Sequence, residues 1–325
     1  MNRPILRLYG LVVVLFALLV AFTSRWTIFQ ASALRENPLN NRQLLEQKRV
    51  DRGRIVTQDG TVLAHSVPAP EASYERRYPT GDEFANAIGY SYVDLSRTGL
   101  ERYRNETLQG IAPSGLQAIL DQLKGVSNRG NEVVTTLDPH AQQVAIAALA
   151  GHEGAVVALD PRSGAVRVMA SSPSFDPNAM RTPASAARLK QAGGNPLVNR
   201  AVQFGYAPGS TFKVVTATAA IDTGRFTPSS TLSGRNGIAV SGVPLNNDQN
   251  ESFGQLTLTQ ALAKSVNTVW AQVAERVGRQ TLMRYMNRFG FDAKPRLDYP
   301  AQEMSASGSY EGERLLLPTN PRVDL

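Results

Sequence analysis

Between residues 206 and 213 the chain reads Tyr206-Ala207-Pro208-Gly209-Ser210-Thr211-Phe212-Lys213. The apolar spacing that follows predicts a helix over Phe212–Asp222, closed by Gly224. The Pro-Gly pair favours a sharp turn into this helix, which leaves Ser210 accessible at its start. Because residues three apart lie on one helix face, we expect the side chains of Ser210 and Lys213 to be in contact.

This serine and lysine can carry nucleophilic chemistry. A serine hydroxyl is a poor nucleophile until a base takes its proton, and a lysine amine kept neutral by burial can be that base. The helix N-terminus adds partial positive charge, which suits a developing oxyanion. The alternative is structural: Ser210 caps the helix and Lys213 is a solvated surface lysine. Only six lysines occur in the chain, which makes a chance lysine at this spacing less frequent.

A second motif lies further along the chain. Leu258–Lys264 predicts a short helix, and Ser265-Val266-Asn267 joins it to a helix predicted over Thr268–Val277. A Ser-x-Asn loop presents a hydroxyl that can relay a proton beside a carboxamide that can hold a substrate amide. The alternative is an ordinary helix junction in which Asn267 is a cap. Together and in this order, the two motifs match the arrangement of acyl-serine enzymes.

The composition excludes several other kinds of site. The chain has no cysteine, which excludes disulfides, thiolate nucleophiles, Cys-ligated zinc and iron–sulfur clusters. His65, His140 and His152 have no ligand-like spacing, so we expect no metal, no cofactor and no Ser-His-Asp triad. The net charge of +7 would suit nucleic acid, but no cluster of five basic residues occurs. We therefore expect no nucleic-acid partner.

The first 25 residues predict a membrane anchor. An uncharged, mostly apolar run extends from Leu8 to Ser24, about 25 Å as a helix. Arg3 and Arg7 precede it, so the positive-inside rule places the N-terminus in the cytoplasm and the bulk of the chain outside. We expect a single-pass protein of the cytoplasmic membrane. A cleaved signal peptide is the alternative, because Ala31-Ser32-Ala33 has an A-x-A shape, but the apolar run is long for one.

Residues 26–150 predict a first folded domain with mixed secondary structure. Two apolar runs, Arg54–Thr57 and Thr61–Ala64, flank an Asp-Gly turn and predict a hairpin. The other predicted elements are a helix over Leu116–Leu123, a strand over Val133–Leu137, and a helix that begins at Pro139 after an Asp138 cap.

Residues 151–325 predict a second domain, and the expected fold class is α+β, with helices on an antiparallel sheet. Ala155–Leu159 and Ala165–Ala170 predict two buried strands without polar alternation. We expect the helices Phe212–Asp222 and Thr268–Val277 to cover them. A last helix is predicted over Thr281–Phe289, with no strand pair after it. A two-stranded sheet is marginal alone, so this domain is expected to be incomplete.

The chain resembles the class B penicillin-binding proteins, most widely the actinobacterial penicillin-binding protein A type. The octapeptide ending in Lys213 and the Ser265-Val266-Asn267 loop are similar to that family's first two motifs. The resemblance extends over nearly the whole chain. Other segments that carry it are Arg52-Gly53-Arg54-Ile55, Asp59-Gly60, Gly99-Leu100-Glu101 with Tyr103, Thr136-Leu137-Asp138 with Gln142, and Asn199-Arg200-Ala201.

The resemblance implies a membrane-anchored D,D-transpeptidase that cross-links peptidoglycan stem peptides ending in D-Ala-D-Ala, in cell division or cell shape. It makes 26–150 a pedestal or dimerisation-like domain and 151–325 the penicillin-binding transpeptidase domain. The implied roles are acyl nucleophile for Ser210, general base for Lys213, proton relay for Ser265 and substrate orientation for Asn267. Implied partners are the lipid-linked precursor, β-lactams as acylating inhibitors, and a polytopic glycosyltransferase in the membrane.

One family motif is missing from this sequence. Lys-Thr-Gly or Lys-Ser-Gly occurs nowhere in it, and Asp222-Thr223-Gly224 falls at a predicted helix end. In the family that motif contributes an oxyanion donor, and loss of one such donor costs about 10²–10³ in rate. We therefore expect a truncated transpeptidase with little or no activity. The alternatives are a sensor that a β-lactam or muropeptide acylates without turnover, and a scaffold of the cell-wall machinery.

Overall fold

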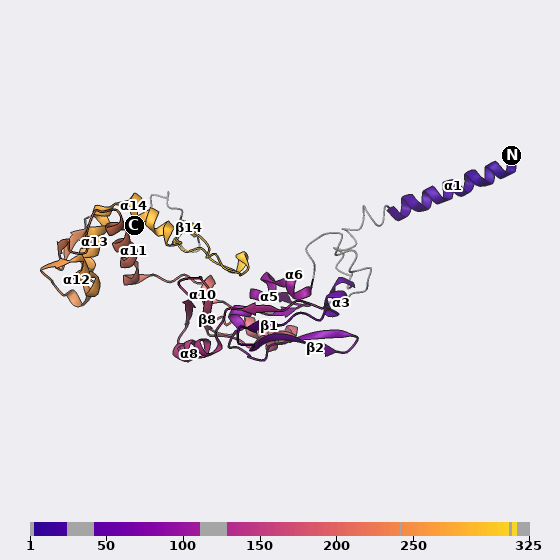
Figure 1. Ribbon diagram of the computed structural model, residues 1–325, viewed down its shortest axis with the longest axis horizontal. Helices are drawn as coiled ribbons and strands as arrows, with labels where there is room; N and C mark the ends of the chain where they lie inside the picture. Colours follow the sequence, from indigo (N-terminus) through magenta and orange to yellow (C-terminus); the bar gives the residue numbers. More distant parts are fainter. Residues whose placement is uncertain (1–2, 25–41, 111–128, 241, 312–313, 317–325) are drawn as a thin grey trace.

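The computed structural model describes residues 3–24, 42–110, 129–240, 242–311 and 314–316 (Figure 1). Its first helix is α1 (Arg3–Ser24). Among the described residues, no helix is both long and apolar enough to cross a membrane. The predicted transmembrane segment therefore stays a prediction. The helix expected over Leu116–Leu123 lies outside the described residues.

A four-stranded sheet, in the order β3-β2-β1-β6, organises the first half of the chain. β1 (Ile55–Thr57) and β2 (Val62–Ala69) form the antiparallel hairpin that the Asp-Gly turn predicted. The predicted strand after residue 132 is β6 (Val133–Thr135), parallel to β1, and β3 (Ser73–Arg77) pairs with β2. Short elements surround the sheet: α3 (Arg42–Lys48), α4 (Ala85–Ile88), β4 (Ser91–Tyr92), β5 (Ser96–Arg97), α5 (Gly99–Tyr103) and α6 (Asn105–Gln109).

The second predicted strand pair is present as β7 (Gly154–Leu159) and β8 (Val166–Ser172), which pair antiparallel. α8 (Pro139–Leu149) begins as predicted, because the Asp138 carboxylate accepts a hydrogen bond from the Ala141 N–H at 3.0 Å. Small side chains let this helix lie close to β8: Ala145 of α8 packs with Val168 and Ala170.

The helices expected to cover this sheet pack elsewhere, so that prediction is wrong. α11 (Lys213–Asp222), α13 (Asn267–Val277) and α14 (Arg279–Arg288) form where the sequence predicted helices, but they pack on one another around a separate core. The apolar stripe of α13, which includes Trp270 and Val273, is buried inside this cluster. Because α11 and α13 pack on each other, the segments that precede them, which carry Ser210 and Ser265, are brought together.

The remaining elements are short segments around the helical cluster and the β7–β8 sheet. They are η2 (Pro177–Arg181), α9 (Pro183–Lys190), α10 (Arg200–Gln203), η3 (Gly209–Phe212), β9 (Thr231–Ser233), β10 (Ile238–Val240), β11 (Val243–Leu245), η4 (Asp248–Asn250), β12 (Gln255–Thr257), α12 (Leu258–Ala263) and η5 (Ala301–Glu303).

A strand pair follows α14, which corrects the expectation that none does. β13 (Ser309–Glu311) pairs antiparallel with β14 (Arg314–Leu316), with Tyr310 opposite Leu315 in the register. The sequence contained a signal for this pair. Gly312 lies between Ser309–Glu311 and Arg314–Leu316, and a glycine between two such short segments is typical of a hairpin.

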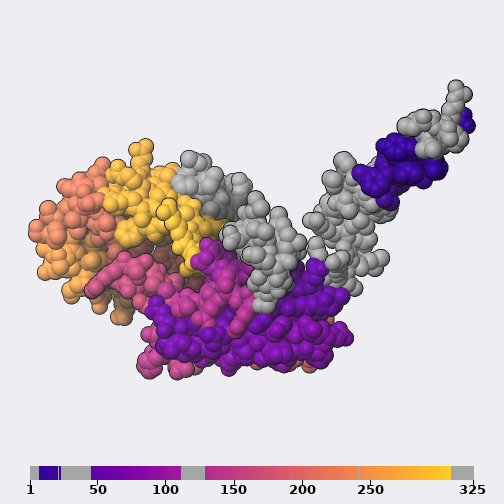
Figure 2. All heavy atoms as spheres, turned by 45° about the vertical axis from the view of Figure 1, so that its right-hand side comes forward, coloured from indigo at the N-terminus to yellow at the C-terminus, as the bar shows by residue number. Residues whose placement is uncertain are grey.

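The largest core joins the two halves of the chain. It contains Ile55, Phe84 and Leu108 from the first half, together with Met180 and Tyr299 from the second. The Tyr299 hydroxyl donates to the backbone oxygen of Asn86 at 2.8 Å, and Arg102 of α5 pairs with Glu303 at 3.0 Å. Figure 2 shows the segment that carries Tyr299 and Glu303, coloured yellow, against the purple and magenta first half. The predicted boundary near residue 150 stays a prediction.

Candidate active site

Ser210 and Lys213 lie on one face of a continuous helical turn, as the spacing predicted. η3 runs directly into α11, and the Lys213 Nζ is 3.1 Å from the Ser210 Oγ. Gly209 begins the turn at φ +54°, a conformation that favours glycine. Ser210 lies within the turn and is exposed, so the alternative that it is a helix cap is wrong.

Packing of α13 against α11 brings the second motif to the same place. The Lys213 Nζ lies 2.9 Å from the Ser265 Oγ, 2.6 Å from the Ser265 backbone oxygen and 2.6 Å from the Asn267 Oδ1. The Ser265 Oγ is also 2.9 Å from the Ser210 Oγ. The four predicted site residues therefore meet around one amine. Asn267 begins α13 without capping it, so its alternative interpretation is also wrong.

The acceptors around the Lys213 amine fit its neutral form. A neutral amine has two N–H donors and one lone pair. The Ser265 carbonyl and the Asn267 Oδ1 only accept, and both are 2.6 Å away, so they use both N–H groups. The lone pair is then left for the Ser210 hydroxyl, 3.1 Å away, whose oxygen accepts from the Ser265 hydroxyl at 2.9 Å. This is the arrangement that a general base needs in order to take the Ser210 proton.

The pKa of Lys213 also favours the neutral form of its amine. Burial lowers the pKa of Lys213 below its ordinary value of 10.5, because removing water disfavours the ammonium form. Lys213 is half-buried and surrounded by neutral oxygens, so it is not the solvated surface lysine of the alternative interpretation. Within the described part of the chain, no group of three or more His, Asp or Glu could hold a metal ion.

Comparison with known families identifies the two halves of the chain. Residues 154–316 match the penicillin binding protein transpeptidase domain, and residues 52–133 match the penicillin binding protein A dimerisation domain. The chain belongs to the penicillin-binding protein transpeptidase family. The resemblance inferred from the two motifs is thereby confirmed.

Individual relatives support this membership. The chain is 34% identical over 312 residues to the peptidoglycan D,D-transpeptidase PbpA of Mycolicibacterium smegmatis, covering 91% of this chain and 63% of that protein. It is 31% identical over 269 residues to the peptidoglycan D,D-transpeptidase MrdA of Escherichia coli, covering 72% of this chain and 42% of that protein. The chain thus spans less than two thirds of these relatives.

A solved structure resembles the fold as well. The imipenem acyl-enzyme complex of penicillin-binding protein A from Mycobacterium tuberculosis superposes with a TM-score of 0.72 at 32% identity. The match covers 82% of this chain and 64% of that one. The family and the α+β transpeptidase fold are therefore shared with these relatives.

The backbone at Ser265 is in a conformation that usually belongs to glycine. α12 ends in a Schellman motif, with the Val266 N–H donating to the Ala261 oxygen at 2.9 Å and the Ser265 N–H to the Leu262 oxygen at 3.1 Å. Ser265 occupies the left-handed position of this motif at φ +53°. In this penicillin-binding protein the position aims both the hydroxyl and the carbonyl of Ser265 at Lys213.

We expect the Ser265→Gly variant to be more stable than Ser265→Ala by about 1 kcal/mol, because only glycine adopts φ +53° without strain. Both variants lose the same hydroxyl, so acylation of Ser210 should slow to a similar extent in both. Urea unfolding followed by circular dichroism gives the stability difference. Equal stabilities would show that the left-handed conformation carries no strain here.

Two asparagines that the sequence analysis did not single out hold the second motif in place. The Asn267 Nδ2 donates to the Asn246 backbone oxygen at 3.1 Å, which directs its Oδ1 at Lys213. The buried Asn247 accepts from the Thr268 N–H at 3.0 Å and donates to the Gly234 oxygen at 3.0 Å. No periodicity or spacing in the sequence connects this loop to the start of α13, so these contacts left no signal in the sequence.

Proposed function

We propose that this chain carries the acyl-transfer site of a peptidoglycan D,D-transpeptidase, a serine enzyme that cross-links stem peptides ending in D-Ala-D-Ala. The observation that carries the proposal is the Lys213 amine, held by two acceptors and facing the hydroxyls of Ser210 and Ser265. The printed activities of the PbpA and MrdA relatives supply the substrate. β-Lactams, which acylate the M. tuberculosis relative, are the proposed inhibitors.

The proposed reaction follows from these contacts. The Ser210 Oγ attacks the carbonyl carbon of the penultimate D-alanine, and the Lys213 Nζ accepts the hydroxyl proton as the C–O bond forms. The proton then passes through the Ser265 Oγ to the nitrogen of the terminal D-alanine, which leaves as the C–N bond breaks. An amine of a second stem peptide attacks the acyl ester, and the reverse proton transfer restores the Ser210 hydroxyl.

Asn267 has two proposed tasks in this scheme. Its Oδ1 takes one N–H of Lys213 and so keeps the lone pair directed at Ser210. Its half-buried carboxamide shares the Lys213 amine with the exposed Ser210, and we propose that it orients the amide of the donor peptide or of a β-lactam.

The wider arrangement is also a proposal. We propose an anchor in residues 1–25, a pedestal or dimerisation-like domain in 26–150 and the transpeptidase domain in 151–325, with the bulk outside the cytoplasmic membrane. Support comes from the exposed apolar side chains of α1, such as Leu15 and Phe16. A polytopic glycosyltransferase is the proposed membrane partner, and a role in division or shape follows from the same scheme.

The test is the acylation of the chain by benzylpenicillin, followed by intact-mass spectrometry. We expect one adduct that maps to Ser210, that is absent in Ser210→Ala and that persists in Ser229→Ala, an exposed serine outside the site. No adduct after prolonged incubation would contradict the proposal. We also propose that the adduct forms slowly and that little or no transpeptidation follows, because the sequence carries no Lys-[Ser/Thr]-Gly. Release of D-alanine from a stem-peptide mimic would separate an enzyme from a sensor that is only acylated.

A further inference from the structure

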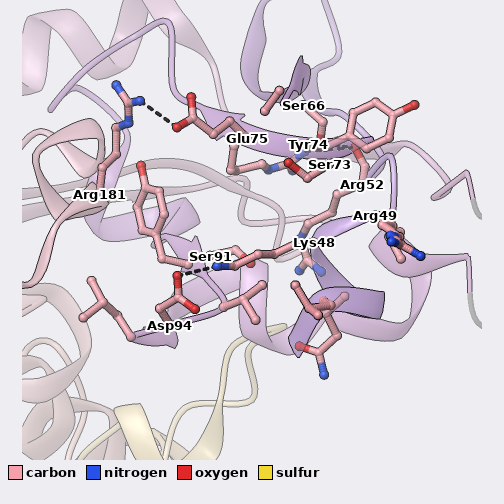
Figure 3. A pocket seen from close by; sticks show the side chains of 18 of the residues that line it. Lys48, Arg49, Arg52, Ser66, Ser73, Tyr74, Glu75, Ser91, Asp94 and Arg181 are labelled. Carbon is pink, nitrogen blue, oxygen red and sulfur yellow. Dashed lines mark hydrogen bonds and ion pairs between the residues drawn. The ribbon is translucent and has the colours of Figure 1, made fainter. Parts of the chain in front are cut away.

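A cavity of about 730 Å³ lies in the first half of the protein and shares no residue with the Ser210 site. Figure 3 shows residues 73–75 of β3 on one side of it and Ser91 and Asp94 on the opposite side. Lys48, at the end of α3, reaches across to Asp94. Arg181 of η2 also lines the cavity, and nothing in the proposed transpeptidase reaction uses it.

The lining of this cavity carries more positive than negative charge. Its acidic residues are Glu71, Glu75 and Asp94, and its basic residues are Lys48, Arg49, Arg52, Arg76, Arg97 and Arg181. Two of the basic groups are neutralised within the cavity, since Lys48 pairs with Asp94 and Arg181 with Glu75, each at 2.7 Å. Arg52 and Arg76 share the single carboxylate of Glu101 behind the wall.

Arg97 adds a positive charge without a carboxylate partner. Its Nε donates to the Ser91 Oγ at 3.1 Å and its Nη2 to the Gln47 Oε1 at 2.8 Å, both neutral oxygens. No Asp or Glu oxygen of the described residues lies within ion-pair distance of it. Burial, and then the neighbouring Arg52 charge, lower the pKa of Arg97, although the Glu101 carboxylate partly opposes them.

Two polar groups of the lining lack partners. The Arg76 side chain is 3% exposed, its Nε pairs with Glu101 and its Nη1 donates to the Arg52 oxygen, but its Nη2 has no hydrogen-bond partner among the described residues. The same holds for the hydroxyl of Tyr92. Both atoms are buried from solvent, so neither can contact a ligand in the cavity, but the charge of Arg76 still adds to the positive potential there.

We propose that this cavity binds a phosphate group, with Arg97 as its main ligand and Arg49 at its rim. The surplus of more than one positive charge favours a doubly charged phosphate over a carboxylate. Arginine provides the planar donor pairs that match phosphate oxygens, and Arg97 has no carboxylate partner that the anion would have to displace. The phosphate belongs to either a soluble ester or a lipid headgroup.

Inorganic pyrophosphate is the probe, titrated calorimetrically into the full chain at low salt. We expect saturable binding to one site, weakened about tenfold or more in Arg97→Gln and in Arg49→Gln, since each removes a charged hydrogen-bond donor. Arg162→Gln, on the exposed turn between β7 and β8, removes the same charge elsewhere and should change affinity less than twofold. Arg49 is exposed, so its replacement leaves the fold intact.

A competition experiment distinguishes the two sources. If vesicles of phosphatidylcholine with phosphatidic acid weaken pyrophosphate binding and plain phosphatidylcholine vesicles do not, the site takes a lipid headgroup. If neither competes, it takes a soluble phosphate ester. The proposal is overturned if pyrophosphate shows no saturable binding, or if Arg162→Gln loses as much affinity as Arg97→Gln. None of these results depends on acylation of Ser210.

Discussion

Replacement of Lys213 by alanine is expected to slow the acylation of Ser210 by benzylpenicillin about 10²- to 10⁴-fold, the range that a positioned general base contributes. In the variant the Ser210 Oγ keeps its hydrogen bond with the Ser265 Oγ at 2.9 Å, and a second neutral hydroxyl cannot take the proton. The rate is measured from the growth of the acyl adduct by intact-mass spectrometry. A loss smaller than about tenfold would show that another group is the base.

Lys213→Arg is the matched control for charge. Arginine keeps a cation at this place but does not lose its proton in proteins, so it cannot act as the base. We expect it to be as slow as Lys213→Ala. A rate close to that of the unchanged chain would mean that the positive charge, and not the base, is what matters.

The pH dependence of the acylation rate is an independent test of Lys213 as the base. The acylation rate should rise with pH as Lys213 loses its proton, because only the neutral amine accepts from Ser210. Burial lowers the pKa of Lys213, so the midpoint of this rise should lie below pH 10.5, the ordinary value for lysine. The rise should be absent in Lys213→Ala, and its persistence there would assign it to a different group.

The sequence predicted the contacts within each motif, but it did not predict the contacts between the two motifs. Ser210 and Lys213 are three residues apart, so helical geometry alone places their side chains together. Their distance from Ser265 and Asn267 depends on how α11 packs on α13, which periodicity does not specify. The family resemblance supplied that step. The support from Asn246 and Asn247 was missed because hydrogen bonds of a loop to a distant helix leave no pattern in the sequence.

The wrong placement of the helices has one physical cause. Apolar runs show that a helix has a face to bury, but they do not say which partner buries it. The helices now seen as α11 and α13 were assigned to the β7–β8 sheet, yet they bury their stripes against each other and α14. α8, built largely of alanine and glutamine, had a weaker apolar pattern, and it packs on β8 because its small side chains allow a close approach.

The strongest expected effect on folding comes from a residue that has no part in the proposed chemistry. Glu101 is fully buried, with one carboxylate oxygen 2.7 Å from the Arg52 Nε and the other 2.6 Å from the Arg76 Nε. Glu101→Ala leaves two buried guanidinium groups without a counter-charge and is expected to lower the free energy of unfolding by about 3–5 kcal/mol. Urea unfolding followed by circular dichroism measures the loss.

A surface pair of the same residue types provides the matched control. The Arg54 Nη2 lies 2.6 Å from the Glu132 Oε2, but both side chains are well exposed, so Glu132→Ala should cost no more than about 1 kcal/mol. If the two variants lose equal stability, the buried cluster contributes nothing beyond an ordinary ion pair.

The pH dependence of stability should also show the contribution of the Arg52–Glu101–Arg76 cluster. Burial raises the pKa of Glu101, but the charges of Arg76 and Arg52 and their hydrogen bonds outweigh it and hold the pKa below the usual 4.5. The unfolded chain therefore binds this proton more tightly than the folded one. The stabilisation should be complete above pH 4.5 and be lost as the pH falls through the folded pKa. Glu101→Gln cannot titrate, so its stability should fall less steeply in that range. An equally steep fall in Glu101→Gln would assign the acid sensitivity to other carboxylates and would leave the Arg52–Glu101–Arg76 cluster without a part in it.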